Sequence, residues 1–178
     1  MLDKQSKLSS PYTRGLFIIE KHKSLVEILV KLSFFMVMLF VIFNFVIGIT
    51  TQTSDSMAPN IKYHDHIIYS RINADYYLRD VVVYEYEGNI YIGRLVGVPN
   101  TLITVDGEGN LFQNDYLVYE DNIFLMDNSE EYTCVLGENQ YFVLCDNRKF
   151  HTDSRNFGPI DKSQIIGVVI MDIRRFGL

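Results

Sequence analysis

The stretch Val81–Ile92, which reads VVVYEYEGNIYI, decides what kind of fold this chain can form. Both of its ends are rich in β-branched and aromatic residues, which favour extended strands. Between them, Glu87-Gly88-Asn89 has the composition of a tight turn. The stretch therefore predicts two antiparallel strands joined by a short connection.

Similar strand-like runs, separated by further turn residues, lie on both sides of this stretch. The turns are indicated by Asp106-Gly107, Gly109-Asn110 and Gly137-Glu138-Asn139. The strand-like runs are His66–Tyr69, Leu102–Val105, Tyr141–Leu144 and Ile165–Ile173. Several short strands joined by tight turns predict a mostly β domain of coiled antiparallel sheets.

An uncharged apolar run, LSFFMVMLFVIFNFVIGI, occupies residues 32–49. As a helix it would cover about 27 Å, close to the ~30 Å of a bilayer core. It lacks the polar face of a buried soluble helix, and a cleaved secretory signal would have a shorter apolar region. We therefore expect a cytoplasmic segment at 1–31, one transmembrane helix at 32–49, and an extracytoplasmic β domain at 50–178.

The distribution of charge predicts this orientation. Residues 1–31 carry six Lys or Arg and three acidic residues, which leaves ten and 19 of the chain's totals of 16 and 22. The basic flank should stay in the cytoplasm, so the β domain is expected outside the plasma membrane. A net charge of −6 without a basic stripe argues against nucleic acid. No spacing suggests metal ligands, and no cofactor is expected.

Two cysteines, Cys134 and Cys145, lie in the part of the chain expected outside the membrane. They flank the predicted turn at Gly137–Asn139, which should place them near one another. Two interpretations stay open: a disulfide, and two small apolar side chains that fill space.

Two motifs carry a resemblance to a known family. Ser54-Asp55-Ser56-Met57-Ala58-Pro59 is similar to the S-x-S-M-x-P box of the type I signal peptidases. Residues 145–158, CDNRKFHTDSRNFG, resemble the family's G-D-N-R-x-x-S-x-D-S-R-x-x-G box. The residues that match this second box are Asp146, Asn147, Arg148, Asp153, Ser154, Arg155 and Gly158. Between the boxes, Arg79–Val83 and Arg94–Pro99 resemble two strands of the family.

The resemblance implies a serine protease whose nucleophile is Ser56, activated by a buried Lys. It also implies that the Ser56 backbone N–H and the Ser54 hydroxyl stabilise the oxyanion. An exported preprotein would bind as an added strand along a cleft, with small side chains in two shallow pockets. Met57, Pro59, Arg94 and the matching residues of the second box would shape that cleft.

The chain departs from the family pattern at the catalytic base. The position of the general-base Lys, immediately before Arg94, is Gly93, which should leave a gap where a long side chain would pack. The Ser that supports this Lys is replaced by His151. His151 is therefore a candidate substitute base oriented by Asp153. Alternatively, His151 fills space and Asp153 pairs with Arg155 and Arg94.

Two functions follow from this departure. The first is a non-proteolytic protein that binds exported preproteins or pilin subunits at the outer face of the lipid bilayer. It resembles degenerate relatives found beside pilus genes in Gram-positive bacteria, where a sortase is the expected partner. The second is an active signal peptidase in which Ser56 works with a substitute base such as His151. The absent Lys favours the first function.

Overall fold

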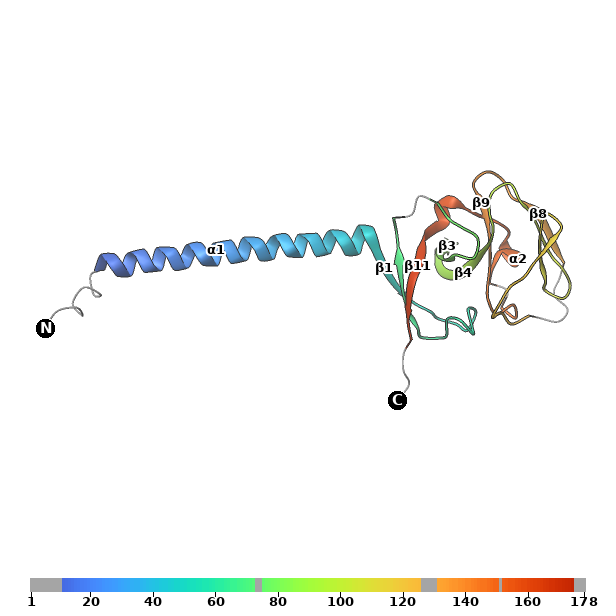
Figure 1. The fold of residues 1–178 in the computed structure, drawn as a ribbon, viewed down its shortest axis with the longest axis horizontal. Helices are drawn as coiled ribbons and strands as arrows, with labels where there is room; N and C mark the ends of the chain where they lie inside the picture. The colour runs from blue at the N-terminus through green and yellow to red at the C-terminus, as the bar shows by residue number, and fades with distance from the viewer. Residues whose placement is uncertain (1–10, 73–74, 126–130, 151, 175–178) are drawn as a thin grey trace. The chain divides into compact units, whose positions relative to one another are not determined.

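The computed structural model describes residues 11–72, 75–125, 131–150 and 152–174, with side chains from residue 23 onward. The chain divides into two compact units, one that ends at Asn44 and one that begins at Phe45. The first unit is helical and the second is built mainly of strands, as the sequence predicts (Figure 1).

The described part of the N-terminal unit is helical. Helix α1 spans Pro11–Val41, and the π-helical segment η2 continues from Ile42 to Val46. Within it, Lys23–Val46 has a mean hydropathy of 2.5 and is long and apolar enough to cross a bilayer, a test that some signal sequences also pass. The helix ends before the apolar run does, because strand β1 begins at Ile47.

Among the described residues, the larger of two sheets has seven antiparallel strands in the order β1-β2-β11-β3-β4-β9-β10. Strands β3 and β4 are neighbours in this sheet and form the hairpin predicted from Val81–Ile92. Two short helices, α2 (Ser154–Phe157) and η3 (Lys162–Gln164), lie between β9 and β11 in the chain. The strands are β1 (Ile47–Thr51), β2 (His66–Ser70), β3 (Val81–Tyr86), β4 (Asn89–Gly97), β9 (Gln140–Leu144), β10 (Ile160–Asp161) and β11 (Ile165–Ile173).

The smaller sheet has four antiparallel strands in the order β7-β6-β5-β8. They are β5 (Leu102–Val105), β6 (Leu111–Gln113), β7 (Tyr116–Val118) and β8 (Tyr132–Val135). Because β8 lies in this sheet and β9 in the larger one, the turn at Gly137–Asn139 joins two sheets and closes no hairpin. Cys134 and Cys145 are both free thiols, so the space-filling interpretation holds for them.

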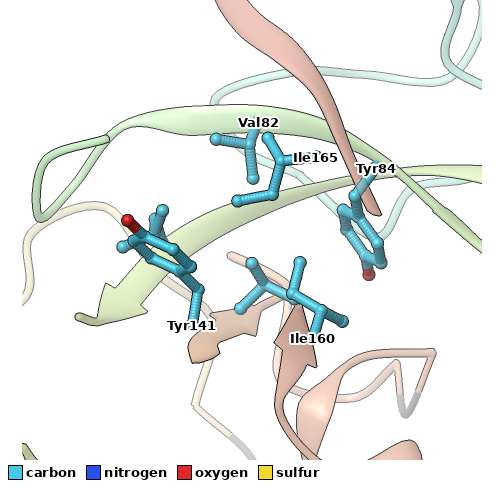
Figure 2. Close-up of a cluster of buried hydrophobic side chains, with 7 residues drawn as sticks. Val82, Tyr84, Tyr141, Ile160 and Ile165 are labelled. Carbon is cyan, nitrogen blue, oxygen red and sulfur yellow. The ribbon is translucent and has the colours of Figure 1, made fainter. Parts of the chain in front are cut away.

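Three clusters of buried apolar side chains hold the β unit together. In one of them, residues from β3, β9, β10 and β11 point toward one another (Figure 2). A second cluster joins β9 to the smaller sheet and includes Ile103, Leu111 and Phe142. The third includes Ile67 on β2 and Met57, the residue that follows Ser56 in its loop.

Candidate functional site

Ser56 lies in the loop that connects β1 to β2 and is only 5% exposed. Its hydroxyl oxygen accepts a hydrogen bond from the side-chain amide of Gln52 at 2.9 Å, and it is hydrogen-bonded to the Ser54 hydroxyl at 3.0 Å. The Ser56 backbone N–H points to the Ser54 hydroxyl oxygen at 3.4 Å. The two serines of the first box are thus brought together, and Gln52 joins them.

The second box holds this loop in place. The Asn147 backbone N–H donates to the Ser56 carbonyl oxygen at 2.9 Å, and the Asn147 side chain donates to the Asp55 carbonyl oxygen at 3.2 Å. Met57, the next residue of this loop, is completely buried and belongs to the third buried cluster. Pro59 follows a cis peptide bond and is partly exposed. The two motifs, which are far apart in the sequence, therefore form one structure.

Asp146 links the loop to strand β4. Its carboxylate receives two hydrogen bonds from Arg94, Nε to Oδ1 at 2.7 Å and Nη2 to Oδ2 at 2.6 Å, and one from Asn60 at 2.7 Å. The hydrogen bond to Asp146 raises the pKa of the Arg94 guanidinium above its ordinary value. The expectation that Arg94 pairs with Asp153 is wrong, because the register of β4 and β9 brings Arg94 opposite Leu144, two residues before Asp146.

Asp153 pairs with Arg155, as expected, and caps helix α2. Its Oδ1 accepts from the Arg155 backbone N–H and Nε, and its Oδ2 accepts from Arg155 Nη2 and from the Cys145 backbone N–H. A carboxylate has about four acceptor sites, and these four donors occupy them. Asp153 therefore has no acceptor site left to orient an imidazole. The neighbouring Ser154 hydroxyl accepts from the Val143 backbone N–H at 3.1 Å, which is a structural role.

Arg148 is fully buried and connects the second box to the segment before it. Its Nε donates to the Cys145 carbonyl oxygen, and its Nη2 forms an ion pair with Glu120 at 2.6 Å. Arg155 Nη1 in turn donates to the Arg148 carbonyl oxygen at 3.0 Å. Burial raises the pKa of the Cys145 thiol to about 12, so this cysteine is neutral at physiological pH.

Gly93 is buried in strand β4 and leaves no empty space, which corrects the expected gap. A Cβ atom built on Gly93 would lie 3.2 Å from Tyr84 Cε1 and 3.4 Å from the Leu144 carbonyl oxygen. The Tyr84 hydroxyl donates to the Thr152 carbonyl oxygen at 3.3 Å. Burial raises the pKa of Tyr84 well above its ordinary value, so its phenol is not a base at neutral pH. The tyrosine ring fills the space beside Gly93.

Within the described residues, no Lys, His, Asp or Glu side chain hydrogen-bonds to Ser56. His151, the candidate substitute base, lies outside the described residues. The Ser56 hydroxyl is therefore surrounded by neutral hydrogen-bonding groups wherever the structure describes its neighbours.

A groove of about 510 Å³ opens beside Ser56. It is lined by the end of β1 and the loop that follows it up to Ser56, by the start of β4, and by Phe150 and Thr152. Strand β9 pairs with β4 only from Arg94 onward, so Asn89–Gly93 pairs with β3 on one side and, in the described part of the chain, with no strand on the other. The free edge of β4 thus lies along the groove.

Sequence reasoning missed Gln52, Asn60 and Tyr84. Gln52 precedes the first motif, and nothing in its local sequence distinguishes it from a linker residue. Asn60 follows the motif, and its link to Asp146 depends on a contact across the fold. Tyr84 is visible in the sequence only as a strand residue, because its position beside Gly93 depends on the pairing of β3 with β4.

Comparisons with known proteins agree with the two motifs. Residues 25–173 match the sequence profile described as "Signal peptidase, peptidase S26". The chain is 29% identical over 168 residues to signal peptidase IB of Staphylococcus aureus strain Mu50, with 83% of this chain and 88% of that protein covered. It is 27% identical over 156 residues to a protein of the same strain named inactive signal peptidase IA, with 82% and 89% covered.

A solved structure of a signal peptidase I from Enterococcus faecalis V583 is 24% identical, with a TM-score of 0.47. The similarity covers 55% of this chain and 98% of the other. The profile match extends over most of the chain and includes both boxes. This protein therefore belongs to the S26 signal peptidase family.

Proposed function

We propose that this protein binds exported polypeptides as an added strand in the groove beside Ser56 and does not cleave them. The observation that carries this proposal is the Ser56 hydroxyl, which has no basic partner within the described residues. A serine hydroxyl is a poor nucleophile without a base to take its proton. Removing one member of such a catalytic unit commonly lowers the rate by several orders of magnitude.

The free edge of β4 supports the proposed mode of binding. Asn89–Gly93 offers backbone donors and acceptors on its unpaired side, and an extended peptide can use them as a further strand. At ~3.3 Å per residue, this edge would take about five residues of substrate. Ile90 is 54% exposed on this edge and lines the groove, so it would contact the bound peptide.

The location of the protein is part of the proposal. The apolar helix Lys23–Val46 would anchor the chain in the plasma membrane with its basic N-terminal flank in the cytoplasm. The β unit from Phe45 onward would then lie outside the cell, where translocated segments emerge. Preproteins are the general class of ligand in this family. Pilin subunits and a sortase stay predictions from the resemblance of the motifs.

A second candidate function is cleavage of signal peptides by Ser56 with a substitute base. One arrangement favours it: Ser54 and Ser56 stay in hydrogen-bonding contact, and Asn147 holds their loop beside an open groove. His151 is the residue that sequence reasoning offers as the base. The names of the two Staphylococcus aureus relatives differ in whether they describe an active enzyme, since one is named a signal peptidase and the other is named inactive.

The test uses the full-length protein in liposomes with a preprotein that carries a small-x-small cleavage site. Cleavage is read by mass spectrometry, and binding is read by the fluorescence anisotropy of a labelled extended peptide. We expect binding without cleavage. Cleavage that is abolished by Ser56→Ala and by His151→Ala would establish the second function and overturn the first.

A matched pair of variants tests the groove itself. Ile90→Glu places a charge on the free edge of β4, and Val135→Glu places the same charge at an exposed position of β8, away from the groove. We expect Ile90→Glu to weaken peptide binding at least about tenfold, since a buried unpaired charge costs more than 1.4 kcal/mol. Val135→Glu should bind like the parent. If both variants bind the peptide with equal affinity, the peptide does not bind along the free edge of β4.

A further inference from the structure

Gln52 is the residue beside Ser56 that neither motif contains. It is 4% exposed, and its backbone is held on both sides by the turn before β2. The Gln52 N–H donates to the Asp65 carbonyl oxygen at 2.9 Å, and its carbonyl oxygen accepts from the His64 N–H at 2.9 Å. Asp65 is itself buried, and its carboxylate accepts from the Lys62 N–H at 2.8 Å. This turn fixes the position from which the Gln52 side chain reaches Ser56.

The hydrogen bond from Gln52 to the Ser56 hydroxyl has a fixed direction, because an amide nitrogen only donates. Gln52 Nε2 donates to Ser56 Oγ at 2.9 Å, and the Ser54 hydroxyl lies within hydrogen-bonding distance at 3.0 Å. A hydroxyl oxygen has two lone pairs, and the Gln52 donor occupies one of them. A nucleophilic serine needs the opposite arrangement, with a lone pair free to attack the carbonyl carbon and a base that takes the proton. The nitrogen of a side-chain amide cannot be that base, because it is only a donor.

We propose that Gln52 is a positioning residue that holds the Ser56 hydroxyl as a hydrogen-bond acceptor and thereby keeps this serine unreactive. The inference deepens the proposed function and rests on it, since it concerns the same peptide-binding groove. Two features then separate this site from a serine protease: the amide of Gln52 and the glycine at position 93. Gln52 also lines the groove, so a bound peptide would lie against this amide.

The substitution Gln52→Glu tests the proposal, because it preserves the shape of the side chain and replaces a donor by an acceptor. The introduced carboxylate would lie about 2.9 Å from Ser56 Oγ, within reach of the hydroxyl proton. The probe is a fluorophosphonate, and the product is read from the intact mass of the full-length protein in detergent. In the reaction, the Oγ–P bond forms, the P–F bond breaks, fluoride leaves, and the proton passes to the carboxylate.

We expect Gln52→Glu to label at Ser56 at least about tenfold faster than the parent, since a positioned base contributes ~10²–10⁴-fold. The rate should rise with pH as the introduced carboxyl loses its proton, a dependence that a purely structural role for Gln52 would not produce. Ser56→Ala shows that the label is on this serine.

Gln52→Met is the matched control, since it has a similar length and neither donates nor accepts strongly. It frees one lone pair of Ser56 without supplying a base, so labelling should increase less than in Gln52→Glu and without the same pH dependence. Thermal melting followed by circular dichroism establishes that each variant is folded. If both folded variants label no faster than the parent, the proposal is overturned.

If neither variant folds, the parent and Ser56→Ala decide the question. The Gln52 side-chain amide resonances in ¹⁵N–¹H spectra must shift when their acceptor is removed, and unchanged resonances would overturn the proposal. Failure of the proposed function is seen separately. A parent that binds no peptide contradicts the binding role, whereas the labelling rates report only on Gln52 and Ser56.

Discussion

At the scale of single residues, Gly93 and Tyr84 have to be considered together. The Tyr84 side chain is completely buried, its hydroxyl is bonded to the Thr152 carbonyl oxygen, and its ring stacks on Tyr91 at a centroid distance of 5.8 Å. Because the hydrogen bond and the stacking both fix the Tyr84 ring in the packed core, it cannot easily move aside for a new atom. Restoring a long side chain at Gly93 therefore requires a change at Tyr84 as well.

Gly93→Ala should destabilise the protein by about 1 kcal/mol, because the added methyl group would press against the fixed Tyr84 ring at 3.2 Å. The free energy of unfolding is measured by urea denaturation. In the background Tyr84→Leu, which removes the ring, the same substitution should cost measurably less. Equal costs in both backgrounds would show that the ring and Gly93 are not coupled.

Asp146 illustrates how one buried carboxylate joins three parts of the site. It is completely buried and receives donors from Arg94 on β4 and from Asn60 on the loop that follows the first box. Its neighbour Asn147 contacts Ser56 directly through the backbone. The Arg94–Asp146 pair therefore determines where the Ser56 loop lies relative to the free edge of β4.

Asp146→Asn should lower the free energy of unfolding by about 3 kcal/mol, because it leaves the Arg94 guanidinium partly buried without its counter-charge. Glu138→Gln makes the same chemical change at an exposed carboxylate and should stay within about 0.5 kcal/mol of the parent. Urea denaturation at neutral pH compares the two variants. A cost below about 1 kcal/mol for Asp146→Asn would contradict a structural role for this ion pair.

At the scale of elements, the two halves of strand β4 have different roles. Its second half, from Arg94 onward, is paired with β9 and contributes Leu95 to the core. Its first half is paired with β3 alone and lines the groove. Unpaired strand edges tend to associate with other strands, and this one is accessible beside Ser56. The change of partner at Arg94 therefore separates the scaffold from the candidate binding surface.

Strand β11 lies between β2 and β3, and Gly167 allows this close approach. A Cβ atom there would overlap the Ser70 carbonyl oxygen and lie 2.7 Å from Tyr69 Cδ2. Gly167→Ala should therefore cost about 3 kcal/mol, since a backbone atom has to move. Gly137→Ala, where the nearest atom is the flexible end of Gln140 at 3.3 Å, is the control and should cost less than 1 kcal/mol. Thermal melting of both variants distinguishes the two positions.

At the scale of the whole molecule, the chain has a helical unit and a β unit, each with its own character. The buried clusters found among the described residues all consist of residues at or beyond Met57. The described apolar side chains of α1 are mostly exposed, which suits a lipid environment.

A fragment that begins at Phe45 should therefore fold by itself, with a melting temperature within a few degrees of that of the full-length protein in detergent. Circular dichroism measures the melting, and flotation with liposomes measures membrane association. The fragment should lose most of its association with lipid because it lacks Lys23–Asn44. An unfolded fragment would mean that the helix contributes to the stability of the β unit.

The sequence by itself determined the features that depend on near neighbours in the chain. All the predicted strand-like runs lie within strands, because β-branched and aromatic residues favour extended backbone wherever they occur together. The apolar run predicted a helix. Only its last residues, from Ile47, form part of strand β1 instead, because they pair with β2. Both family motifs were visible without any structure.

Tertiary structure alone decided which distant residues meet. The pairing of Arg94 with Asp146, the ring of Tyr84 beside Gly93 and the amide of Gln52 on Ser56 all depend on sheet register or on loop packing. A shift of one residue in the register would turn the Arg94 and Tyr84 side chains to the other face of the sheet, and no local pattern encodes the register chosen. The surroundings of the Ser56 hydroxyl therefore include Gln52, a neighbour in space that the motif around Ser56 does not contain.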